Sequence, residues 1–200
     1  MSLMRASLGD GRERTLMADP IANALITLPN NHSYIHKGQH FKIGISDLYE
    51  DTGQKLSLSV ATPGWIPTSS QHDTVYHMVW RHWSFGPVSF GIYEDCSSVS
   101  GGSVLTPMNN NRTSLHEYTT DLTVTGGELT RTGGSLILPL YYSGAAQGGA
   151  SVTAQGFGSR DDDEILLKAA SLYVFEMIAL DSVDHYAGLE LGWYEYVPEF

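Results

Sequence analysis

The chain has 200 residues, with 22 acidic and 11 basic side chains and a formal net charge of −11. This balance argues against nucleic acid as the main partner, because phosphate binding requires clustered lysine and arginine side chains. The single cysteine, Cys96, excludes an internal disulfide framework. No apolar run approaches the length of about 18 residues that crosses a bilayer, and no secretory signal is visible, so we expect no membrane partner.

Residues 1–32 are predicted to form an N-terminal arm separate from the body. The segment carries Arg5, Arg12 and Arg14 but little periodic apolar content. A proline could open a short helix over residues 21–25, and the alternative is an extended arm. A basic segment on an acidic body favours docking onto an acidic neighbour, whereas disorder of the terminus is the alternative interpretation.

Residues 33–200 are predicted to form one all-β domain, a jelly-roll-like β-sandwich of two sheets. Short segments alternate polar and apolar residues or are continuously apolar, and turn signals separate them. A helix over residues 163–171 is the one plausible competing element, and it is too short to change the fold class. The predicted strands cover residues 40–45, 55–60, 75–83, 88–94, 115–124, 135–142, 164–168, 171–180 and 189–196.

Two further segments are predicted to be loop or turn. Residues 97–114 are rich in serine, glycine and asparagine and indicate a long loop, and Gly126 with Gly127 indicates a turn. Within the long loop, asparagine side chains can bond to the neighbouring backbone, and Arg112 can reach a carboxylate or a partner. Stiffening of the loop and contact with a partner are equal alternatives.

The histidines show no pattern typical of a metal site. His36 and His40 are four residues apart, but they fall in a predicted loop and strand, where this spacing does not bring two rings together. His77 and His82 would point to opposite faces of one strand. The acidic run at residues 161–164 lacks the alternating spacing of a calcium loop. We therefore expect no metal and no cofactor.

Catalytic motifs are also lacking, and we expect the protein not to be an enzyme. A glycosidase that uses Glu94 or Glu195 is a weak alternative, since no paired-acid motif is readable. The four tryptophans and eleven tyrosines favour a packed core or a subunit contact over a sugar site.

Short segments of the body follow one another in an order that resembles a known family. They are Ile35-His36-Lys37-Gly38 leading into Phe41, Ala61-Thr62-Pro63, Ile92-Tyr93-Glu94, Gly101-Gly102, Pro107, Asn109, Asn111-Arg112-Thr113-Ser114, Glu164-Ile165-Leu166-Leu167-Lys168, Leu172-Tyr173-Val174-Phe175 and Trp193-Tyr194-Glu195. This layout, over residues 33–196, resembles the head decoration (cement) proteins of tailed bacteriophages. The family pattern has an Asn-Thr turn where this chain has Ala169, Ala170 and Ser171.

The resemblance implies a jelly-roll virion protein that performs no chemistry. Such a protein is made in the host bacterial cytoplasm, binds the outer surface of the major capsid protein lattice and stabilises the shell, usually as a homo-dimer or homo-trimer. On this hypothesis the partner contacts come from the arm and from the asparagine-rich loop, through Arg5, Arg12, Arg14, Asn109, Asn111 and Arg112. The alternative function is a carbohydrate- or receptor-binding module of a phage tail or head fibre, with Trp65 or Trp83 at the glycan.

Overall fold

The structure is a computed structural model in which every regular element described is a β-strand. It describes residues 39–64, 74–111, 119–138, 140–143 and 164–196, and three strands that precede them. None of these residues is helical, which confirms the predicted all-β class. The strands are β1 (Leu3–Ser7), β2 (Glu13–Ala18), β3 (Leu25–Leu28), β4 (His40–Tyr49), β5 (Lys55–Ala61), β6 (Val75–Ser84), β7 (Val88–Leu105), β8 (Met108–Asn109), β9 (Thr123–Leu136), β10 (Tyr141–Ser143), β11 (Ile165–Leu167), β12 (Leu172–Ala179) and β13 (His185–Tyr196).

The first three strands form a small antiparallel sheet of their own, in the order β1-β2-β3. The sequence between β1 and β2 contains Asp10-Gly11, a dipeptide typical of hairpins. Leu25 begins β3 and so does not belong to the helix offered for residues 21–25, whose other residues lie outside the described part of the chain. The described part of the predicted arm therefore consists of paired strands.

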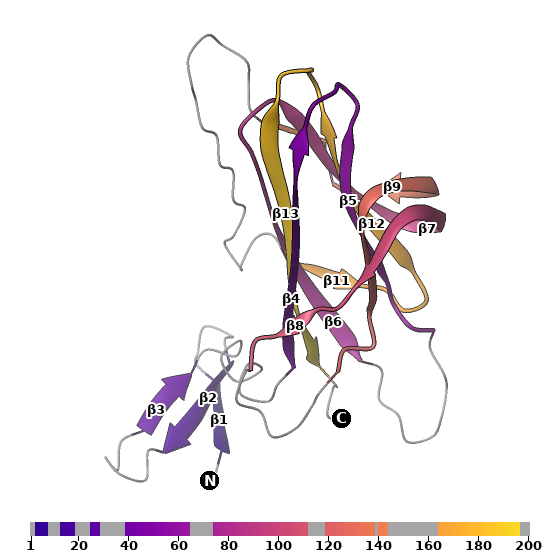
Figure 1. The fold of residues 1–200 in the computed structure, drawn as a ribbon. Helices are drawn as coiled ribbons and strands as arrows, with labels where there is room; N and C mark the ends of the chain where they lie inside the picture. The colour runs from indigo at the N-terminus through magenta and orange to yellow at the C-terminus, as the bar shows by residue number, and fades with distance from the viewer. Residues whose placement is uncertain are drawn as a thin grey trace.

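A five-stranded antiparallel sheet, β11-β6-β13-β4-β8, forms one layer of the body (Figure 1). β13 is its central strand and pairs with β4 and β6 along most of its length. In β6 the residues Tyr76, Met78, Trp80 and His82 are buried, whereas the residues between them are half-buried or exposed. One face of this sheet therefore lies on the core, and the other reaches the surface.

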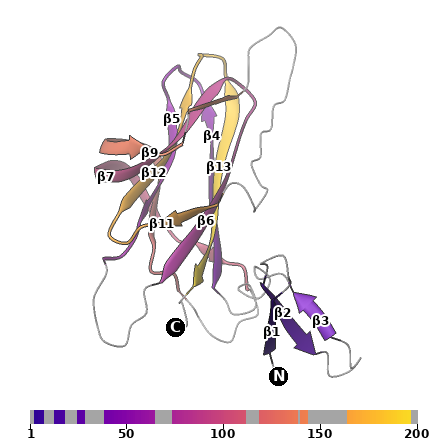
Figure 2. The same cartoon turned by 180° about the vertical axis from the view of Figure 1, so that it is seen from behind.

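The second sheet has the order β10-β7-β12-β5-β9, and β7 also pairs with β9. As a result β7, β12, β5 and β9 close on themselves into a small barrel. The first part of β7 pairs with β12 and its last part pairs with β9, and the pairing is irregular between Cys96 and Ser98 and between Gly101 and Ser103. Such bulges bend a strand, and both views show β7 and β9 curling out at the side of the body (Figures 1 and 2).

The hydrophobic core lies where the two sheets meet. The ring centroids of Trp80 and Phe175, which come from different sheets, are 6.3 Å apart. Phe41 and Trp193 stack at 5.6 Å within the first sheet, and the Tyr49 hydroxyl donates a hydrogen bond to the Met177 carbonyl in the second. The described core residues contributed by both sheets form one cluster, from Phe41 to Trp193.

The structure corrects three of the predictions of local structure. Residues 97–105 continue β7 and residues 108–109 form β8, so most of the predicted loop at 97–114 lies in strands. Gly126 and Gly127 lie inside β9, opposite β5, and do not form a turn. The competing helix at 163–171 is wrong, because Ile165–Leu167 is β11 and Ala169 and Ala170 form a turn. In each case pairing with a distant strand outweighs local composition.

Candidate binding surfaces

The predicted arm residues occupy different register positions in the small sheet. Arg5 lies opposite Thr15, and Arg14 lies opposite Ala6, so the two arginines are not cross-strand partners. Arg12 lies outside the described residues. Whether these arginines touch a partner stays a prediction.

The asparagine-rich segment is held against the first sheet. Asn109 lies in β8 opposite Phe41, and its side-chain oxygen accepts a hydrogen bond from the Asn111 backbone amide at 2.8 Å. The Asn110 backbone amide donates to the His40 carbonyl at 2.9 Å. Asparagine bonding to nearby backbone thus stiffens the segment as one of the two interpretations expects, while its contact with a partner stays a prediction, and Arg112 lies outside the described residues.

The barrel carries a long exposed surface that we call the neutral ribbon. It consists of the exposed residues of β7 from Ser97 to Val104 and of β9 from Glu128 to Leu136, and apart from Glu128 these are serine, threonine and glycine with two apolar residues. The exposed Asp95 borders it. Short side chains lose little rotamer freedom when a partner covers them. The residues are Ser97, Ser98, Ser100, Gly101, Gly102, Ser103, Val104, Glu128, Thr130, Thr132, Gly133, Gly134, Ser135 and Leu136.

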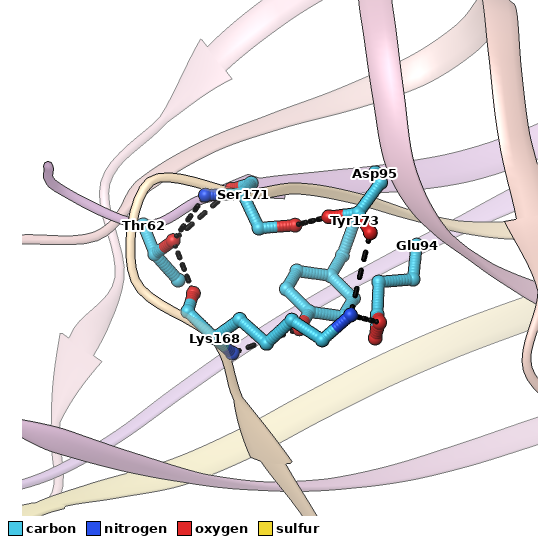
Figure 3. Close-up of polar contacts among 6 residues, drawn as sticks. All are labelled: Thr62, Glu94, Asp95, Lys168, Ser171 and Tyr173. Carbon is cyan, nitrogen blue, oxygen red and sulfur yellow. Dashed lines mark hydrogen bonds and ion pairs between the residues drawn. The ribbon is translucent and has the colours of Figure 1, made fainter.

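A polar cluster at the β11–β12 turn, which we call the turn cluster, fixes the start of this ribbon (Figure 3). Lys168 Nζ lies 2.5 Å from a Glu94 carboxylate oxygen and 3.3 Å from an Asp95 carboxylate oxygen. The Ser171 hydroxyl donates to the other oxygen of Asp95 at 2.7 Å. The hydrogen bond from Ser171 and the contact with Lys168 lower the pKa of Asp95, and Glu94 and then Asp95 raise the pKa of Lys168.

The rest of the turn cluster joins the same turn to the end of β5. Thr62 Oγ1 lies 2.6 Å from the Lys168 carbonyl and accepts a hydrogen bond from the Ser171 amide at 2.9 Å. The Tyr173 hydroxyl accepts a hydrogen bond from the Lys168 amide at 2.8 Å, and burial raises the pKa of that tyrosine. The turn cluster (Thr62, Glu94, Asp95, Lys168, Ser171 and Tyr173) therefore holds three strand ends together.

A second ionic cluster lies inside the small barrel. Glu176 on β12 is only 3% exposed, and its carboxylate oxygens lie 3.2 Å from Lys55 Nζ and 3.6 Å from Arg131 Nε. The Arg131 guanidinium also lies 3.4 Å from the centroid of the Tyr93 ring, an arrangement that favours a cation. Glu176 is not among the candidate residues predicted from the sequence, although a lone acid inside an otherwise apolar strand is a signal that it needs a buried partner.

His77 and His82 lie on opposite faces of β6 and in different surroundings. His77 contacts Glu164 and its ring stacks on Tyr194 at 4.4 Å, on the surface-facing side of β6. His82 is buried against the Phe90 ring, and burial lowers its pKa to about 4. No group of three or more potential metal-binding side chains occurs among the described residues.

The two acids considered for catalysis do not form a pair. Glu94 on β7 is engaged with Lys168, and Glu195 on β13 accepts a hydrogen bond from the Thr120 hydroxyl at 2.5 Å. They belong to different sheets and to different polar clusters.

Comparisons of the chain with protein-family models, with curated proteins and with solved structures find no match. Within the described part of the chain, no helix is long and apolar enough to cross a membrane.

Proposed function

We propose that the protein is a capsid decoration protein of a tailed bacteriophage. In this proposal it is a non-catalytic virion protein that forms a homo-dimer or homo-trimer, binds the outside of the major capsid protein lattice and stabilises the shell. Its two facing sheets are a variant of the jelly-roll sandwich in which one sheet has curled into a barrel. The arm and the Asn109–Asn111 segment supply contacts with the shell.

The observation that carries this proposal is the composition of the turn cluster. Four of the segments on which the resemblance rests each contribute one side chain to it: Thr62, Glu94, Lys168 and Tyr173. Thr62, Glu94 and the segment 168–173 lie far apart in the sequence but meet at one place in the fold (Figure 3). Because side chains from these segments contact one another, the segments have a shared structural role. This supports the interpretation of the segments as one family pattern.

The neutral ribbon suits the task of lattice binding. Protein interfaces are depleted in lysine, glutamate and aspartate, and Glu128 is the one such residue on the ribbon, whose start is bordered by the exposed Asp95 and Lys168. The turn cluster and the Glu176 cluster hold both ribbon strands on the body, so little backbone conformational freedom would be lost on binding. Modest contacts repeated over a shell then give strong attachment through avidity.

Co-sedimentation with expanded shells of the encoding phage, prepared without this protein, tests the proposal. We expect saturation at a fixed ratio to the major capsid protein. Introducing Ser100→Lys with Thr130→Lys, which are exposed cross-strand partners on the ribbon, should weaken shell binding about tenfold by placing charges in the interface.

The matched control adds the same two charges at exposed turn residues, as Thr52→Lys with Ser182→Lys. This control should bind like the wild type. An absence of shell binding by the wild-type protein would overturn the proposed function. Equal losses in the two double variants would instead remove the ribbon as the contact.

A further inference from the structure

The surface-facing side of the β11-β6-β13-β4-β8 sheet is a regular array of cross-strand rows. Along β13 the rows are centred on Tyr186, Gly188, Glu190, Gly192 and Tyr194. Trp83 lies beside Gly188, Arg81 beside Glu190, Val79 beside Gly192 and His77 beside Tyr194. The face is therefore a strip that runs six residues along β6, roughly 20 Å at about 3.3 Å per residue.

The end of this strip near Tyr186 carries the aromatic side chains Trp83, Phe85 and Tyr186, which we call the aromatic platform. A Cβ atom on Gly188 would lie 2.3–2.5 Å from three indole atoms of Trp83, so the indole covers the glycine backbone. Trp83 and Phe85 pack edge to face with ring centroids 5.6 Å apart. Phe85 and Tyr186 are 52% and 57% exposed, and the Phe85 amide donates to the Tyr186 carbonyl. Trp83 and Phe85 thus meet at the surface, and the exposed Tyr186 lies on the neighbouring strand beside Phe85.

The opposite end of the strip carries a second aromatic pair, His77 and Tyr194, which also contacts the Glu164 carboxylate. The His77 and Tyr194 rings stack with an interplanar angle of 13°, and the Tyr194 hydroxyl donates to Glu164 at 2.8 Å. Both rings are half-buried.

Charged groups lie between the two aromatic ends. Lys42 Nζ and a Glu190 carboxylate oxygen are 3.6 Å apart, and both side chains are about 40% exposed (42% and 41%). Arg81, the cross-strand neighbour of Glu190, is exposed. Because this ion pair is solvated and weak, its donors and acceptors are available to a ligand. Gly44 and Gly192 have no side chain, so the sheet surface is recessed beside Glu190 and Lys42.

We propose that this strip binds an extended carbohydrate chain. The face of an aromatic ring carries partial negative charge and attracts the C–H groups of a sugar ring, so the two aromatic ends would each stack on a sugar. The sugar hydroxyls would accept from Arg81 and Lys42 and donate to Glu190. A protein partner fits less well, because it would have to desolvate a row of three charged side chains at the centre of its interface.

A glycan array of bacterial capsular and O-chain polysaccharides and of plant and animal oligosaccharides, probed with the isolated protein, identifies the ligand class. Isothermal titration with the best-binding oligosaccharide then measures affinity. Trp83→Ala should weaken binding about tenfold or more, and Gly188→Ala should do the same while keeping the indole, since the new Cβ displaces it from the sheet.

Val104→Ala is the control, because it removes an exposed apolar side chain on the neutral ribbon, away from the strip. It should bind glycan like the wild type, and the urea unfolding midpoints of all variants show whether they fold. No array signal above that of Trp83→Ala overturns the proposal. So does a wild-type dimer that Trp83→Ala dissociates without any glycan binding, which would make the strip a contact between copies. The experiment uses no capsid, so its result is independent of the decoration function.

Discussion

At the scale of residues, we expect substitution of Glu176 to lower the free energy of unfolding strongly. Its carboxylate is buried beside Lys55 and Arg131, whose side chains are 32% and 25% exposed, so Glu176→Ala leaves two half-buried cations without their counter-charge. Breaking one partner of a buried ion pair destabilises by about 3 kcal/mol, and urea unfolding measures this loss. Glu190→Ala is the matched control, because its ion pair with Lys42 is exposed and should be worth less than about 1 kcal/mol. Equal losses in the two variants would contradict this account of the barrel.

His82 should make stability depend on pH. Burial lowers its pKa to about 4 in the folded protein, against about 6.5 in an unfolded chain. The unfolded state therefore binds the proton first as the pH falls. The contribution of neutral His82 to the free energy of unfolding is complete above pH 6.5. It is lost progressively between pH 6.5 and 4, by roughly 3 kcal/mol in total.

The variant His82→Phe keeps a ring against Phe90 but does not titrate. Its urea unfolding midpoint should change less between pH 7 and 4 than that of the wild type. The same slope in both proteins would show that His82 is not the group responsible.

At the scale of elements, the backbone of the β11–β12 turn is strained at Ala170, and this strain can be tested by substitution. Ala170 has a φ of 53°, in the left-handed region that disfavours residues with a Cβ. Ala170→Gly should therefore raise the free energy of unfolding, by about 0.5 kcal/mol after the entropic cost of glycine. Ala169→Gly, one residue earlier in the same turn and without a positive φ, should lower it by a similar amount. Thermal unfolding of the two variants measures the difference, and destabilisation of both would contradict the strain.

The elements also show where sequence patterns succeed and where they fail. Alternating or continuously apolar residues located β4, β5, β6, β12 and β13, because each of these strands buries side chains in the core and such burial leaves a pattern in the chain. The second half of β7 has no such pattern, because its outer residues are the serines and glycines of the neutral ribbon. Its pairing partner, β9, lies about 30 residues further along, and nothing local in either strand specifies the other.

The same limit applies to the candidate sites. The sequence singles out Glu94 and Lys168 as parts of separate segments, but only the fold brings them within 2.5 Å of each other. Trp83 was recognised as a candidate for glycan stacking, whereas its platform depends on Gly188, Phe85 and Tyr186, and two of these come from another strand. Residue types can be predicted from the chain, but the distances that make a site come from pairing.

At the scale of the whole molecule, the body should fold without residues 1–32. The described core residues run from Phe41 to Trp193, and no strand pairing joins the β1-β2-β3 sheet to either larger sheet among the described strands. A chain of residues 33–200 should therefore keep a β-sheet circular dichroism spectrum, without the contribution of the small sheet, and the urea unfolding midpoint of the full chain. Under the proposed function, its occupancy on phage shells should fall, because the arm and its three arginines are lost.

Two comparisons separate the arm from its charge. Deletion of residues 1–19 should lower shell occupancy nearly as much as deletion of 1–32, since both remove Arg5, Arg12 and Arg14. Replacing these three arginines by glutamine in the full chain should reproduce most of that loss, and the loss should shrink as salt is raised, because salt screens contacts between exposed charges. Unchanged occupancy in all three proteins would exclude the arm as a shell contact, and a loss of the folded spectrum in the 33–200 chain would show that the small sheet completes the body.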